Sequence, residues 1–126
     1  MGAGYAAFLD IMGFSSIVSS GAWLVVSVIV VLTVVPPALR PSTFLPHRIE
    51  HAAIFLAAGT LFGMAYLGRE WILSVRAIVF CAAIEAAQLY VPGRHARLSD
   101  FIVDATAAVF GVFVGQLLSR TRFFSR

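Results

Sequence analysis

The chain has 126 residues, of which 60% are hydrophobic and only 12% are charged, and its mean hydropathy is +0.94. This composition is far from that of soluble domains, and about four helical spans of roughly 20 residues would occupy the whole length, which excludes a separate soluble domain. The net charge of +3 comes from arginines scattered along the chain rather than gathered into a stripe, which excludes a nucleic-acid surface. We therefore expect an integral membrane protein in contact with the lipid bilayer.

The N-terminal segment carries Asp10 where a signal peptide would be apolar and has no basic region before it, so we expect no cleavage. Four apolar side chains fall at helical spacing on one face of this segment: Tyr5, Phe8, Leu9 and Met12. A short interfacial helix, a loose tail and an early turn of the first membrane span all fit this pattern.

Four apolar segments are predicted to cross the bilayer, at residues 17–36, 49–67, 71–91 and 99–118. Proline ends the first segment, and Pro92 with Gly93 ends the third and opens a tight turn. Ser99 fits the N-cap of the fourth. The predicted fold class is an all-α membrane protein, a bundle of four transmembrane helices in one domain over residues 1–126.

Four spans place both termini and the LGREW turn on one membrane face, and the other two connections on the opposite face. The termini side holds five arginines and the other side four, which favours cytoplasmic termini by the positive-inside rule. The start of the second span, the end of the third and the start of the fourth then meet at the same face. Polar residues that are scattered in the sequence are therefore expected to converge there.

Glu85 lies six residues before the end of its predicted span, roughly 9 Å below the helix terminus. A carboxylate at that depth is costly unless it is paired, protonated or facing a hydrated pocket, so it is a candidate functional group. Gln88 shares its helix face and can bind the same ligand. The alternative is that both side chains only tie helices together through hydrogen bonds.

Asp100 and Asp104 are spaced i, i+4, so the two carboxylates share a helix face and need a compensating charge. Arg94 and Arg97 in the preceding turn are the nearest candidates, and a guanidinium suits a carboxylate or an anionic ligand equally well. The alternative for Asp100 is that it only complements the helix dipole.

His47 and His51 have the i, i+4 spacing of a metal-chelating pair, but no cysteine or zinc-protease signature accompanies them, so we expect no metal. Cys81 is the single cysteine and is expected to be a small core residue. The chain has no nucleophile elbow, phosphate-binding loop or dinucleotide fingerprint, so we expect no cofactor, and an enzyme with Glu85 or His51 as base is the least supported reading.

Two G-x-x-x-G steps, one formed by Gly59 with Gly63 and the other by Gly111 with Gly115, predict close helix packing. The contact can lie inside the bundle or with a partner helix outside it.

These residues, in this order, resemble the VanZ-like family of small bacterial membrane proteins. The segment HRIEH supplies Arg48 and His51, IEAAQLYVPGR supplies Glu85, Gln88 and Arg94, and SDFIVDATAAVFG supplies Asp100 and Gly111. Departures from the family pattern mark a divergent member, and they fall at His47, Ala52, Asp104 and Ala107.

The resemblance implies a multi-pass protein of the bacterial inner membrane that acts on the cell envelope, since the family's founding role is low-level resistance to the glycopeptide teicoplanin. We expect a polar pocket that binds or modulates an envelope component, such as an anionic lipid or a lipid-linked or glycopeptide-type ligand. Its lining is predicted to be Arg48, His51, Glu85, Gln88, Arg94, Arg97, Asp100 and Asp104. The alternative is an accessory subunit that packs against partner membrane proteins in a larger complex and has no chemistry of its own.

Overall fold

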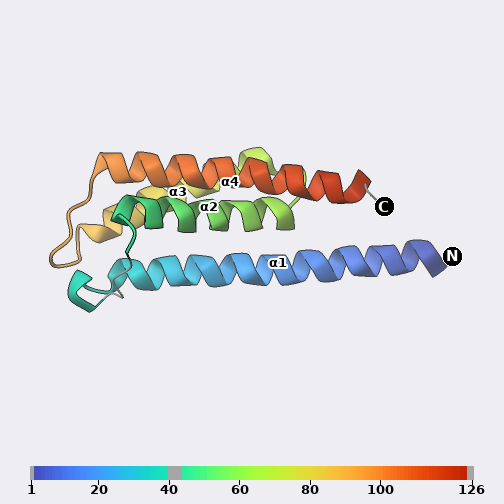
Figure 1. Ribbon diagram of the computed structural model, residues 1–126, viewed down its shortest axis with the longest axis horizontal. Helices are drawn as coiled ribbons and strands as arrows, with labels where there is room; N and C mark the ends of the chain where they lie inside the picture. The colour runs from blue at the N-terminus through green and yellow to red at the C-terminus, as the bar shows by residue number, and fades with distance from the viewer. Residues whose placement is uncertain (1, 40–43, 125–126) are drawn as a thin grey trace.

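The computed structural model describes residues 2–39 and 44–124, and the regular structure in them is entirely helical. Helix α1 (Gly2–Val34) is followed by a single 3-10 turn, η1 (Pro37–Leu39), and then by α2 (His47–Ala65), α3 (Glu70–Gln88) and α4 (Leu98–Phe124). The four α-helices run side by side along one axis (Figure 1). The all-α fold with four helices is confirmed.

The helix ends follow the turn residues of the sequence. Pro46 precedes α2 in an extended conformation, and the two short connections each contain a glycine with positive φ, Gly68 at 74° and Gly93 at 81°. The helix α4 begins at Leu98, so Ser99 is inside the first turn rather than at the N-cap, and its hydroxyl donates to Oδ1 of Asp100. As Figure 1 shows, the start of α1 and the end of α4 lie at the same end of the bundle as the α2–α3 turn, with α1 extending beyond that turn, and the other two connections lie at the opposite end.

Helix α1 is one uninterrupted helix of 33 residues, about 50 Å long. The N-terminal segment, for which a separate interfacial helix was one of the expectations, is therefore the first part of α1. Two serines attach α1 to the end of α2: Ser15 donates to the carbonyl oxygen of Ala65 at 2.9 Å, and Ser19 shares a hydrogen bond of 2.9 Å with the hydroxyl of Tyr66.

Within the described residues, two helices are long enough and apolar enough to cross a membrane. They are the segments Phe8–Val34 and Leu98–Arg122, with mean hydropathies of 2.4 and 1.9. The other two, α2 and α3, have 19 residues each, carry charged side chains and are not among these candidates. Of the four predicted spans, α1 and α4 thus have the length and composition of a membrane-crossing helix.

The largest interface in the bundle joins α2 to α4, and glycines make it possible. A Cβ atom added to Gly59 would lie 2.0 Å from the carbonyl oxygen of Ala108, and one added to Gly115 would lie 2.1 Å from that of Thr60. Gly63 and Gly111 are equally close to the facing backbone. The two G-x-x-x-G steps therefore face each other within this chain, and we call this contact the glycine seam.

The outside of the bundle is rich in apolar side chains, and its hydrophobic core contains several polar ones. Large apolar side chains are exposed on every α-helix, for example Leu24, Leu56, Val79 and Leu117. Several polar side chains are buried instead, and these are Thr33, Ser74, Glu85, Gln88, Asp104, Gln116 and Ser119. Water favours the opposite arrangement, whereas a lipid environment leaves apolar side chains outside and requires polar ones to find partners inside.

Gln116 shows how such a buried polar group is used. Its amide nitrogen donates to the carbonyl oxygen of Tyr66 at 2.9 Å, and its amide oxygen accepts from the backbone N–H of Gly68 at 3.0 Å. These bonds satisfy backbone groups of the α2–α3 turn that no helix can pair. The turn is thereby held against α4.

Candidate polar binding site

The polar residues predicted to converge lie where the N-terminal ends of α2 and α4 meet the C-terminal end of α3. The central contact joins Nδ1 of His51 to Oδ2 of Asp104, at 3.2 Å. Asp104 is almost completely buried, at 2% exposure, and lies more than one helical turn inside α4. Asp104 lies one helical turn deeper than Asp100, so the Asp104 carboxylate is buried and the Asp100 carboxylate lies near the surface.

Glu85 is buried beside this pair and interacts electrostatically with His51, Asp100 and Asp104. One of its oxygens, Oε1, accepts a hydrogen bond from the backbone N–H of Arg97. That bond anchors the residue immediately before α4 to the last turns of α3. Gln88, one turn further along α3, is also buried.

Two carboxylate oxygens in this group have no hydrogen-bond donor among the described residues. They are Oε2 of Glu85 and Oδ1 of Asp104, and both atoms are inaccessible to solvent. Buried carboxylate oxygens normally accept hydrogen bonds, because leaving them unpaired costs roughly 1 to 3 kcal/mol or more. We call His51, Glu85 and Asp104 the acidic cluster.

Arg48 and Asp100 form the outer rim of the acidic cluster. Nε of Arg48 lies 3.7 Å from Oδ1 of Asp100, and the Arg48 side chain is 62% exposed. An ion pair this open to solvent contributes little to stability.

The two arginines of the α3–α4 connection are not placed as compensating charges for the aspartates. Nη2 of Arg94 donates to the carbonyl oxygen of Leu32 at 2.9 Å, near the C-terminal end of α1, where helix carbonyls accept hydrogen bonds from side chains. Arg97 contacts Glu85 through its backbone, while its side chain is exposed. Arg97 borders an open hollow of about 310 Å³ that Glu85 also lines, between α3 and the start of α4.

A metal site is not assembled from the part of the chain that the structure describes, because no three histidine, cysteine, aspartate or glutamate side chains there are grouped to hold an ion. The side chain of His47 lies outside the described residues. Cys81 is a free, buried thiol in the core beside Phe55 and Ile84.

Sequence reasoning missed two contacts that shape this end of the bundle. The carbonyl oxygen of Leu32 has no sequence signature, because every residue of an apolar helix end offers the same group. The backbone N–H of Arg97 has no sequence signature either, although a position just before a helix start means that it lacks an intrahelical acceptor. That rule is the one signal that could have indicated an acceptor such as Glu85 nearby.

With this geometry established, the chain was compared with protein-family models, curated proteins and solved structures, and none of the three comparisons gives a match.

Proposed function

We propose that this chain is a VanZ-like protein of the bacterial inner membrane whose four helices all cross the bilayer. The large apolar side chains exposed on every α-helix and the two strongly apolar helices support this location. Helices of 19 residues are about 28 Å long, which matches a hydrocarbon core of about 30 Å, so α2 and α3 have sufficient length. Their more polar composition is consistent with helices that turn charged groups such as Glu85 into the bundle.

We further propose that the acidic cluster binds the polar part of a cell-envelope component, in the class of lipid-linked peptidoglycan precursors or glycopeptides. The observation that carries this proposal is the pair of buried oxygens without donors, on Glu85 and Asp104. Sugar hydroxyls and peptide amides are donors that would satisfy them. The exposed guanidinium of Arg97 beside Glu85 suits a phosphate on the same ligand.

Glu85→Gln is expected to fold normally and to bind a lipid-linked peptidoglycan precursor about 10- to 100-fold more weakly, because hydrogen bonds to a charged acceptor contribute about 1.5 to 3 kcal/mol. The amide keeps an oxygen for the N–H of Arg97, so the fold is preserved. Binding is measured by titrating the precursor into purified protein in detergent, and folding by thermal unfolding in the same detergent.

The matched control is Glu70→Gln, the same change at the other end of α3, where Glu70 lies 3.5 Å from Arg120. This variant should bind like the wild type. Undecaprenyl phosphate, which lacks the sugar and peptide donors, should bind weakly to all three proteins. Unchanged binding by Glu85→Gln, or the recovery of the native protein in a stoichiometric larger complex with no precursor affinity, would favour the accessory-subunit alternative.

The proposed orientation, with cytoplasmic termini, is tested by cysteine labelling. His95 lies in the exposed α3–α4 connection, so His95→Cys is expected to react with a membrane-impermeant thiol reagent in intact spheroplasts. The native Cys81 is only 2% exposed and gives a low background. Thr121→Cys, exposed near the end of α4, should react only after lysis. Labelling of Thr121→Cys in intact spheroplasts, with His95→Cys labelled only after lysis, would show that the termini are on the outside.

A further inference from the structure

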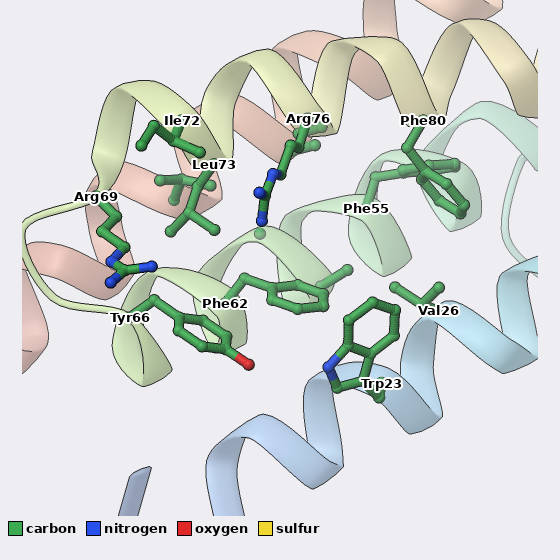
Figure 2. Close-up of a pocket in the computed structure, with 15 residues that line it drawn as sticks. Trp23, Val26, Phe55, Phe62, Tyr66, Arg69, Ile72, Leu73, Arg76 and Phe80 are labelled. Atoms are coloured by element: carbon green, nitrogen blue, oxygen red, sulfur yellow. The ribbon is translucent and has the colours of Figure 1, made fainter. Parts of the chain in front are cut away.

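An apolar cavity of about 260 Å³ lies between α1, α2 and α3, with Ala108 and Val112 of α4 also lining it, towards the end of the bundle opposite the acidic cluster. Figure 2 shows that Trp23 and Val26 of α1, Phe55 and Phe62 of α2 and Phe80 of α3 border it. A dry cavity of about 150 Å³ holds a benzene ring, so this one has room for a longer apolar group such as part of one acyl chain. Helices α1 and α3 make few direct contacts, which leaves the space between them.

Two arginines of the α3 segment border the same cavity. Arg69 and Arg76 lie on one helix face with Leu73, and Figure 2 shows both guanidinium groups directed towards the cavity. Neither guanidinium forms an ion pair with a carboxylate among the described residues, whereas Arg120 pairs with Glu70 and Arg48 with Asp100. The cavity is thus almost entirely apolar, apart from two positive charges that no carboxylate of residues 2–39 and 44–124 pairs with.

The charges and the apolar walls are ordered along the bundle axis. Arg69 and Tyr66 lie at the α2–α3 turn, and Arg76 lies about two turns further along α3. Phe80 and Phe55 border the deeper part, and Phe80 is about 16 Å along the helix from Arg69. A molecule that fits this order has an anionic head at the turn and an apolar chain that extends towards the middle of the bundle.

We infer that this cavity binds an acidic membrane phospholipid, with its phosphate held by Arg69 and Arg76 and one acyl chain between α1 and α3. The inference rests on the membrane location proposed above, but it concerns a different site and a different ligand. A guanidinium facing the hydrocarbon region is costly without an anion, and the fork of arginine nitrogens pairs well with phosphate oxygens. The bilayer supplies both parts of this ligand in one molecule.

Trp23 provides a local reporter, because the chain has only two tryptophans and Trp71→Phe leaves Trp23 alone at the cavity. The protein is reconstituted into phosphatidylcholine vesicles that contain a small fraction of either phosphatidylglycerol or phosphatidylcholine with brominated acyl chains. Bromine quenches tryptophan fluorescence on contact. Phosphatidylglycerol is expected to occupy the site more strongly, by about 5-fold for each arginine, and Arg69→Gln with Arg76→Gln should abolish this preference.

The control removes the same charge from the same end of the bundle. Arg120→Gln with Arg122→Gln should retain the preference, because neither side chain borders the cavity. If the double glutamine variant of Arg69 and Arg76 fails to fold, Arg69→Lys with Arg76→Lys keeps the charge without the fork and should show a reduced preference. Equal quenching by both lipids, or equal losses in the two charge-removal variants, would overturn the assignment.

The lipid-binding experiment and the test of the proposed function can fail independently. The precursor titration depends on Glu85 at the other end of α3 and is run on the same proteins. Absence of the lipid preference in the protein that keeps Arg69 and Arg76, with intact precursor binding, would overturn the lipid site alone, and failure of the protein to enter vesicles would overturn both proposals.

Discussion

Gly59→Ala is expected to destabilise the protein by about 1 to 3 kcal/mol or more, because the added Cβ would lie 2.0 Å from the carbonyl oxygen of Ala108. The clash is with backbone, so no side-chain rotation relieves it and α2 and α4 must separate along the glycine seam. Combining Gly59→Leu with Gly115→Leu should leave no folded protein. Thermal unfolding of the purified protein in detergent measures the first effect, and yield from the membrane measures the second.

Gly21→Ala is the matched control, since Gly21 is in the middle of α1 and has nothing within 4 Å of its added Cβ. This change should leave stability unchanged or raise it by up to about 1 kcal/mol, because alanine favours helix more than glycine does. Equal stability of Gly59→Ala and the wild type would show that the two helices are not in backbone contact at this seam.

The second large effect is expected at the buried pair of His51 and Asp104, whose side chains are 19% and 3% exposed. Removing one partner of a buried pair costs about 3 to 5 kcal/mol, because the other is left without compensation. His51→Ala and Asp104→Ala should each be strongly destabilising, and the double variant should be milder than their sum by about 1 to 3 kcal/mol. Denaturant unfolding in mixed micelles measures all three free energies.

The rim pair of Arg48 and Asp100 offers the comparison, because it also joins α2 to α4 and its side chains are more open to solvent, at 62% and 24% exposure. Its double-mutant cycle should give a coupling of about 0 to 1 kcal/mol. Equal coupling in the two pairs would mean that the His51–Asp104 contact is open to water and that the acidic cluster is not a desolvated site.

The gross arrangement could be predicted from the sequence because its causes are local. Pro46 and Pro92 limit where helices can run, and short connections force neighbouring helices to be antiparallel, so the meeting of Glu85 with Asp104 follows from counting turns. The glycine steps also indicated close packing. Their partner could not be predicted, because a G-x-x-x-G step is the same whether it faces this chain or another.

The detailed partners within the site could not be predicted. Pairing Arg94 with an aspartate was the simplest electrostatic expectation, yet the side chain reaches the carbonyl oxygen of Leu32. That outcome depends on the path of the α3–α4 connection, which a glycine with positive φ at position 93 sets and which charge patterns do not describe. The cavity beside Arg69 and Arg76 was missed because both arginines were interpreted as charges at the end of a span that set the membrane topology.

The glycine seam joins two helices that are not consecutive in the chain, and this fixes the order in which the bundle can be completed during synthesis. Helix α2 and then the whole of α3 are synthesised before Ala108 and Val112 of α4 exist to cover Gly59 and Gly63. At about 5 to 20 residues per second, that interval lasts a few seconds or longer. During this interval the backbone at Gly59 and Gly63 is uncovered. The last helix to be synthesised is therefore the one that protects the nascent chain from packing against a wrong helix.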